Sequence, residues 1–358
     1  MDEETITFQG AVSPLPLPHN TQNVMGHGSG GKMTYDLIRN VFFEAFKKNT
    51  PHLGDDGAVI EFSEIRITPQ DLVISTDAHV VSPLFFPGGD IGRLAVCGTV
   101  NDVAMMGAQP LYITAGFILE EGLKISVLSR IARSMQSAAE EAGVDIIAGD
   151  TKVVQKGKAD GLYITTSGFG FRNNHLALSG AFAQPGDKII LSGSIGEHGI
   201  AVLSARGEFG FDINIKSDIS PLNHLVRKML SVSQGIHVLR DPTRGGLATT
   251  LNEIAEQSGV RIIVDETTIP IHPAVQSACE MLGLDPLYVA NEGKLVAFTS
   301  LKEVEKILHT MQSEPYGKDA VVIGEVTEKA PAQVLLRTTF GTHRVLSKLS
   351  GELLPRIC

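Results

Sequence analysis

DIGRLAVCGTVNDVAMMG, residues 90–107, predicts a helix that is apolar on almost every side. A helix with this pattern is buried inside a domain rather than lying on its surface. Asp102 is the one charged side chain in its second half. A carboxylate in such surroundings is costly unless it is paired or binds a cation. We therefore expect a buried central helix with Asp102 at a functional site.

Strand-like runs flank this helix at residues 72–76 and 111–119. Residues 124–142 predict a second helix, because their apolar residues recur on one helical face, and Gly143 stands at the C-cap position. The first half is completed by expected strands at 144–149 and 161–171 and an expected amphipathic helix within residues 32–48.

The second half begins after a turn at residues 184–187 and again mixes strands and helices. Expected helices lie at 197–207, 245–258, 272–282 and 301–311, and expected strands at 188–193, 261–265, 294–300, 320–326 and 333–338. A chain of 358 residues is too long for one core. We expect an α/β (α+β) fold of two mixed domains, 24–175 and 180–345, with an extended arm at 1–23 and a flexible tail at 346–358.

Composition excludes several classes of protein. The chain has 40 acidic and 30 basic residues, a net charge of −10, which argues against nucleic acid or an anionic membrane as partner. Its three cysteines, Cys97, Cys279 and Cys358, give neither a disulfide framework nor a zinc site. No signal peptide and no membrane-spanning run is visible, so we expect a cytoplasmic protein.

A glycine-rich stretch, GHGSGGK at residues 26–32, precedes the first expected helix. It nearly satisfies the dinucleotide and P-loop patterns, but both require a strand before the glycines, and a proline-rich arm stands there instead. Gly30, Gly31 and Lys32 still offer N–H groups and a cation to an anion at the start of a helix. The alternative is a flexible hinge.

Five aspartates stand in conspicuously apolar or glycine-rich surroundings. They are Asp55, Asp56, Asp77, Asp102 and Asp150. Carboxylates that converge need a multivalent cation, and a purely oxygen ligand set favours Mg²⁺, which normally accompanies nucleotide phosphates. Any one of these residues alone is equally compatible with a turn or a helix cap.

Four further polar residues are candidates for ligand contacts. Lys152 can neutralise a phosphoryl group, or it can be a solvated lysine on an edge strand. Asp241 and Thr243 precede Gly245 in a turn that opens a helix, where the alternative is an Asp-Pro turn with Thr243 as N-cap. Glu292 is a candidate general acid or base, and its alternative is a polar turn.

Cys358 is the last residue of the sequence and follows Leu-Pro-Arg-Ile. A thiol at the end of a tail can enter a pocket as a carrier of a reacting group, or it can be inert.

Together these motifs resemble the HypE family of hydrogenase maturation factors, in the superfamily of aminoimidazole ribonucleotide synthetase and selenophosphate synthetase. The resemblance covers about residues 24–358. It rests on HGSGGK (27–32), GDDGAVI (54–60), the run from Ser75 to Ala108, GFILEEG (116–122), GDTKVVQKG (149–157), DPTRGG (241–246), ANEGKLV (290–296), GKDAVVIGEV (317–326) and PRIC (355–358). The FFPGGDIG stretch (85–92) and the PRIC ending point to HypE rather than to the wider superfamily.

The resemblance implies a fold and a reaction. It implies a first domain whose sheet pairs with that of a second subunit into a barrel-like homodimer, with ATP near the interface. A carbamoyltransferase, HypF, would carbamoylate Cys358, and ATP would then drive dehydration of the S-carboxamide to a thiocyanate. The cyano group would pass to the iron of [NiFe] hydrogenase on the HypC–HypD complex.

The resemblance also implies roles for individual residues. The positions that hold Mg²⁺ and the ATP phosphates are matched by Asp55, Asp56, Asp77, Asp102 and Asp150. Of these, the metal ligands would be Asp56, Asp77, Asp102 and Asp150. The same ATP site would include Asn101 and Thr151. Lys152 and Glu292 match positions that orient and deprotonate the carboxamide, with His27 lining the site.

Two other functions remain open at this point. One is a small-molecule ATP enzyme of the superfamily, of the selenophosphate or thiamine-phosphate type, which would leave Cys358 without a role. The other is a nucleotide-binding scaffold that recruits partners through its tail.

Overall fold

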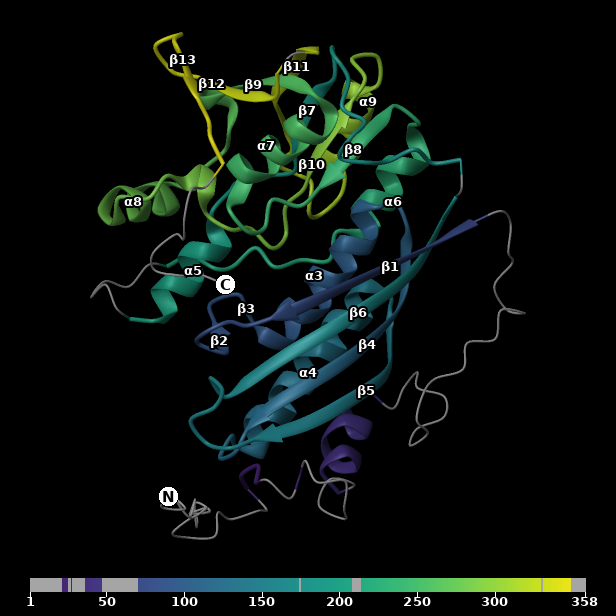
Figure 1. Cartoon of the computed structure of the whole chain (residues 1–358), viewed down its shortest axis with the longest axis vertical. Coiled ribbons are helices and arrows are strands. Elements are labelled where there is room, and N and C mark those ends of the chain that lie inside the picture. Colours follow the sequence, from purple (N-terminus) through teal and green to yellow (C-terminus); the bar gives the residue numbers. More distant parts are fainter. Residues whose placement is uncertain are drawn as a thin grey trace, which may run out of the picture.

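Two α/β domains are stacked along the long axis of the molecule in a computed structural model (Figure 1). The structure describes residues 21–24, 27, 36–46, 70–173, 175–207, 214–329 and 331–348. The elements of the first domain are η2 (Ile38–Phe43, a π-helix), α2 (Glu44–Phe46), β1 (Gln70–His79), β2 (Phe85–Phe86), β3 (Gly89–Asp90), α3 (Ile91–Met105), β4 (Gln109–Glu120), α4 (Ile125–Ala142), β5 (Asp145–Val154) and β6 (Leu162–Asn173).

A four-stranded sheet forms the base of this domain, in the order β1-β6-β4-β5. Helices α3 and α4 cover one face of it (Figure 1). The other face carries exposed apolar side chains, including Leu72, Ile74 and Ile118. Pairing between the strands is antiparallel except for β4 with β5.

Helix α3 is the buried helix that the sequence predicts. Only Arg93 and Asp102 among its residues are not fully buried, and Asp90 caps its first turn by accepting the N–H groups of Gly92 and Arg93. The helix lies close to β6, because a Cβ at Gly168 would stand 2.6 Å from Thr99. Glycine in the strand therefore allows the close packing of helix on sheet.

The second helix is also confirmed. Helix α4 ends at Ala142, and Gly143 follows in the left-handed conformation, with a φ of 70°, as a C-cap. Its apolar face, from Leu128 to Ala142, is buried against α3 and the sheet, as the periodicity predicts.

The second domain is built on a seven-stranded sheet, in the order β13-β12-β9-β11-β7-β10-β8. Its elements are β7 (Lys188–Leu191), α5 (Glu197–Ala205), α6 (Asn223–Val232), β8 (Ile236–Arg240), α7 (Gly246–Ser258), β9 (Val260–Asp265), η3 (Glu266–Thr268), α8 (Pro273–Leu282), η4 (Pro286–Tyr288), β10 (Val296–Thr299), α9 (Val304–Gln312), β11 (Val321–Lys329), β12 (Gln333–Arg337) and β13 (His343–Val345).

Helices cover both faces of this sheet. Helix α7 packs on the face that carries Ile189 and Leu191, whereas α6 and α9 pack on the face that carries Ile190. Helix α6 and strand β8 were not predicted from the sequence, although Leu225, Val226 and Met229 give α6 a buried stripe. The expected helix at 301–311 begins only at Val304, since residues 301–303 form a turn.

Two other predictions concern membrane spans and cysteines. Within the described residues, no helix combines the length and apolarity that a membrane crossing requires. Cys97 and Cys279 are free and buried, and burial raises the pKa of the Cys97 thiol to about 12 and that of Cys279 to about 11. Both thiols are therefore packed, unreactive side chains.

The contact between α3 and β6 generates a stability prediction. Gly168→Ala places a methyl group against Thr99 and Val103 and should lower the free energy of unfolding by about 1–3 kcal/mol. Ser167→Ala, the neighbouring change on the opposite face of β6, should stay within about 0.5 kcal/mol of the unaltered protein. Urea unfolding of both variants measures the difference, and equal losses would contradict the packing described.

Candidate active site

The first part of the site lies where α3 faces β1. Ser75, on β1, donates its hydroxyl proton to Asp102 on α3, with 2.7 Å between Oγ and Oδ2. Asp77, two residues along the same strand, lies on the same face of the sheet and interacts electrostatically with Asp102. Burial, with the Asp77 charge adding to it, raises the pKa of Asp102, while the Ser75 hydrogen bond and Arg240 oppose the rise.

The second domain brings two more carboxyl groups to this place. Asp241 follows β8, and burial together with the charges of Asp102 and Asp77 raises its pKa to about 7. Glu292 precedes β10 in a turn, and burial raises its pKa well above the usual range, with Asp241, Asp218, Asp77 and Asp102 adding to the rise. These mutual effects show that the carboxyl groups of both domains share one poorly solvated region.

Asn101 connects the two halves of the site. Its Nδ2 donates to the carbonyl oxygens of Ser220 at 3.0 Å and Glu292 at 3.4 Å, and its Oδ1 accepts the N–H of Leu222 at 2.8 Å. The side chain is only 1% exposed. The Asn101 amide thus forms hydrogen bonds only to backbone groups of the second domain, and it links the two domains beside Asp102.

Asp150, Thr151 and Lys152 lie elsewhere in the same chain. They belong to β5, which is three strand spacings from β1, or about 14 Å. Asp150 pairs with Gly116 and shares the uncovered face of the sheet, whereas Asp77 is in the row of Thr166 and Ala115, on the helix-covered face. One chain therefore does not gather Asp150 with Asp77 and Asp102 as the sequence analysis expected.

Lys152 and Thr151 differ in exposure on this strand. Lys152 Nζ lies 2.7 Å from Asp150 Oδ2, and both side chains are largely exposed. This pair lowers the pKa of Asp150. Within one chain Lys152 is the solvated edge-strand lysine of the alternative interpretation. Thr151 is buried, in the row of Phe117 on the helix-covered face.

Thr243 does not cap the following helix. Gly245 is the N-cap of α7, with a φ of 75°, and the Thr243 carbonyl accepts the N–H of Gly246. His27 is buried, and its Nδ1 accepts the N–H of Val24 in a turn whose Asn23 is bonded to Leu123, before α4. Gly30, Gly31, Lys32, Asp55, Asp56 and Cys358 lie outside the described residues.

Three residues of the site were not predicted as site residues. Ser75 holds Asp102, Asp218 accepts the N–H groups of Glu292 and Gly293, and Lys294 forms ion pairs at 3.3 Å with Asp218 and with Glu197. Lys294 stands in the ANEGK motif, which is a sequence signal. Asp218 stands in SDISPLN, where nothing marks it.

The donor set suits a hard cation only in part. Carboxylate and hydroxyl oxygens of Asp77, Asp102 and Ser75 are the ligand types that Mg²⁺ prefers. Within the described part of the chain, however, no three His, Cys, Asp or Glu side chains are grouped to hold a metal ion. Asp55 and Asp56, two further aspartates expected at this site, lie outside the described residues.

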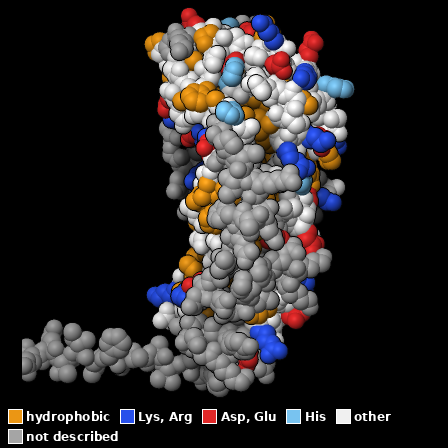
Figure 2. All heavy atoms as spheres, turned by 90° about the vertical axis from the view of Figure 1, so that its right-hand side faces the viewer, with side chains coloured by type: hydrophobic (Ala, Val, Ile, Leu, Met, Phe, Trp, Pro, Cys, Tyr) orange, Lys and Arg blue, Asp and Glu red, His pale blue; other side chains and the backbone are white. Residues whose placement is uncertain are grey.

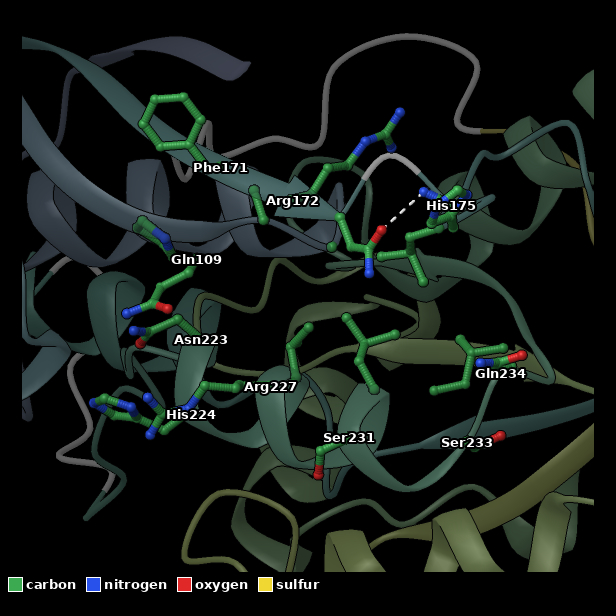
Figure 3. Close-up of a pocket in the computed structure, with 18 of the residues that line it drawn as sticks. Gln109, Phe171, Arg172, His175, Asn223, His224, Arg227, Ser231, Ser233 and Gln234 are labelled. Atoms are coloured by element: carbon green, nitrogen blue, oxygen red, sulfur yellow. Dashed lines mark hydrogen bonds between the residues drawn. The ribbon is translucent and has the colours of Figure 1, made fainter. Parts of the chain in front are cut away.

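A separate cavity of about 650 Å³ lies between the domains. It is lined by the start of β4, the end of β6 and helix α6, and none of the predicted site residues lines it. Figure 3 shows Gln109, Asn223 and His224 gathered at one end of it and Ser233 and Gln234 at the other. The candidate site is therefore not this cavity.

Comparison with known proteins shows the family to which the chain belongs. Residues 54–171 match the N-terminal domain model, and residues 184–336 the C-terminal domain model, of AIR synthase related proteins. Carbamoyl dehydratase HypE of Cupriavidus necator is 54% identical over 334 residues, 93% of this chain and 94% of that protein. The chain belongs to the HypE family. The relatives of this family are named carbamoyl dehydratases, so it is a family of enzymes.

Solved HypE structures share the whole two-domain fold. A HypE structure in complex with ATP superposes with a TM-score of 0.88 at 47% identity, covering 94% of this chain and 99% of that one. HypE in a HypE–HypF complex gives a TM-score of 0.75 at 47% identity, covering 87% and 99%. The mixed α/β fold of two domains expected from the sequence is therefore that of the HypE family.

The raised pKa of Asp241 generates a prediction for pH dependence. Its ordinary pKa is 3.8 and its pKa in the folded protein is about 7. Between these values the folded state holds a proton that the unfolded state has released, so this contribution to stability is lost as pH rises from about 4 to about 7. In Asp241→Asn this loss of stability is absent, and relative to the unaltered protein the variant should gain up to about 4 kcal/mol across that range.

Urea unfolding of both proteins at several pH values measures this gain. Only the difference between the two proteins is informative, because buried His198, whose pKa is lowered to about 4, contributes the opposite slope in both. A difference in the free energy of unfolding that stays constant with pH would contradict the assignment.

Proposed function

We propose that this chain is an ATP-dependent carbamoyl dehydratase that acts on its own Cys358. The carbamoyl group on the Cys358 sulfur is dehydrated to a thiocyanate, which supplies the cyanide ligand for the iron centre of [NiFe] hydrogenase. Membership of the HypE family supports the class of reaction. The observation that carries the assignment is Glu292, a carboxyl group with a strongly raised pKa among the carboxylates of both domains.

The reaction balances with ATP as the acceptor of the oxygen atom. The carboxamide oxygen attacks the γ-phosphorus of ATP, so that ADP leaves, the first N–H proton is released to solvent and an S-linked imidate phosphate forms. A base then removes the remaining N–H proton, the C–O bond breaks with loss of phosphate, and S–C≡N results. Glu292 takes that proton, since a carboxylate whose pKa is raised is a stronger base once it is ionised.

The carboxylates of the first domain hold the nucleotide. Asp77 and Asp102, with Asp55 and Asp56, would hold the phosphates through Mg²⁺, which would neutralise charge on the transferred phosphoryl group when bound. Asn101 sets the distance between this group and Glu292. A HypE relative has been solved in complex with ATP, which supports ATP as the nucleotide.

Two protein partners complete the proposed cycle. A relative of HypF supplies the carbamoyl group, supported by the solved HypE–HypF complex. A HypC–HypD complex receives the cyano group. Cys97 and Cys279 are buried thiols with raised pKa values, which leaves Cys358 as the candidate carrier.

A homodimer would complete the site. The uncovered face of the first sheet carries Leu72 at 53% and Ile74 at 58% exposure, which suits an interface between two copies. Asp150 and Lys152 lie on this same face. In a barrel closed through the edge strands β1 and β5, Asp150 and Lys152 of one chain would approach the strand end that carries Asp77 in the other. Figure 2 shows further hydrophobic side chains at the surface of one side of the molecule.

Intact-mass measurement tests the carrier. Incubated with a HypF relative, carbamoyl phosphate and ATP, the full chain should gain a carbamoyl group and then lose the mass of one water in a step that requires ATP. Cys358→Ser should gain nothing, whereas Cys279→Ser, a matched removal of a buried thiol, should behave like the unaltered chain. The proposal would be refuted if Cys358→Ser became carbamoylated, or if the unaltered chain did not.

A mixed dimer tests whether the site is shared between chains. Asp77→Asn and Lys152→Met should each be inactive alone. Mixed in equal amounts, half of the dimers are mixed, and each has one site with both residues intact, so about a quarter of the activity should return. Water loss from carbamoylated protein is the readout. No recovery would place both residues of a site in one chain.

A further inference from the structure

The turn that carries Glu292 is held by side chains from distant segments. Asn291 is fully buried; its Oδ1 accepts the N–H of Gly196 at 2.7 Å, and its Nδ2 donates to the carbonyl of Pro242 at 2.9 Å. The Glu292 carbonyl accepts from Asn101 Nδ2 at 3.4 Å and from the N–H of Ser220 at 3.4 Å. Hydrogen bonds thus fix the turn on both sides of the Glu292 side chain, at residue 291 and at the Glu292 carbonyl.

Asp218 holds the N–H groups of the same turn. Its Oδ1 accepts the N–H of Glu292 at 3.1 Å, and its Oδ2 accepts the N–H of Gly293 at 3.2 Å. The Asp218 side chain is 1% exposed. A Cβ at Gly293 would stand 1.8 Å from the Asp218 carbonyl oxygen, so only glycine allows the two segments to lie this close.

Lys294 supplies the charge that Asp218 needs. Its Nζ lies 3.3 Å from Asp218 Oδ2 and 3.3 Å from Glu197 Oε2, and its own side chain is 14% exposed. A buried carboxylate is tolerated when it is paired and hydrogen-bonded, and Asp218 meets both conditions. An ionised carboxylate offers acceptors only, which is what two converging N–H groups require.

We propose that Asp218 is the positioning residue for Glu292, and this rests on the proposed role of Glu292 as the base. Both Asp218 oxygens fix the backbone of residues 292 and 293, and Lys294 pairs with Asp218 Oδ2. The glutamate side chain is thereby presented to the carboxamide without Asp218 touching the reacting atoms. A displaced base loses rate even where the chemistry of its side chain is unchanged.

Asp218→Asn tests this role, because the amide keeps the volume but points an N–H₂ group at one of the two backbone donors. The rate of water loss from the carbamoylated full chain should fall on the order of 100-fold. The KM for ATP and the rate of carbamoyl loading should stay within about twofold, since neither depends on the base. Backbone amide exchange of residues 292 and 293 should become faster.

Two further variants serve as the control and as the lower limit of the dehydration rate. Glu197→Gln removes the other carboxylate that pairs with Lys294 but leaves both N–H contacts, so its amide exchange and rate should match the unaltered chain. Glu292→Gln sets the lower limit of the dehydration rate, since this variant should be carbamoylated at Cys358 without dehydrating the carbamoyl group. If Asp218→Asn dehydrates at the unaltered rate, or if Glu197→Gln loses as much as Asp218→Asn, the positioning role is wrong.

The readouts separate this inference from the proposed function. If the unaltered chain never loses water, the proposed function fails, and amide exchange in Asp218→Asn still decides whether Asp218 holds the turn. If Asp218→Asn does not fold, Gly293→Ala displaces the same turn while leaving the Asp218 charge in place. Gly293→Ala should then reduce dehydration with normal carbamoyl loading, and unchanged dehydration would overturn the proposal.

Discussion

Burial of helix α3 on almost every side is the constraint on which the rest of the structure depends. The helix contacts the first sheet, α4 and the second domain, so its residues are small or apolar and Gly168 must lie beneath it. Successive helical residues point about 100° apart. Asn101 and Asp102 therefore serve different neighbours, one bonding to the second domain and the other facing β1.

This arrangement brings carboxyl groups together at a junction where water is scarce. Burial and mutual repulsion raise the pKa values of Asp102, Asp241 and Glu292. Arg240 offsets part of this rise at both aspartates, together with the Ser75 hydrogen bond at Asp102 and a backbone hydrogen bond at Asp241. Lys294 is committed to Asp218 and Glu197. An acidic region with so little internal compensation is suited to a ligand that arrives with its own cations, as a magnesium nucleotide does.

The sequence predicts local elements well and long-range pairing poorly. A nearly continuous apolar run identifies α3, periodicity identifies α4, and Gly143 marks the end of α4, because these signals depend on neighbouring residues. The same patterns do not reveal the strand order, which separates Asp150 from Asp77 although both end apolar runs. Asp218 stands in an unremarkable segment, and its importance comes from contacts with residues more than 70 positions away. Asn101 is identified as part of the site, but only the structure reveals that its amide is fully bonded to backbone.

The first sheet carries Asp77 and Asp150 on its two opposite faces. Side chains in one row across a sheet share a face, so Asp77 points toward α3, and Asp150 points away from it. Strands β6 and β4 lie between β1, which carries Asp77, and β5, which carries Asp150. No change of side-chain rotamer can therefore bring the two aspartates together within one sheet. If both aspartates serve one nucleotide, the sheet of a second chain has to supply one of them. The exposed apolar side chains on the uncovered face are where such a chain would gain the most by burial.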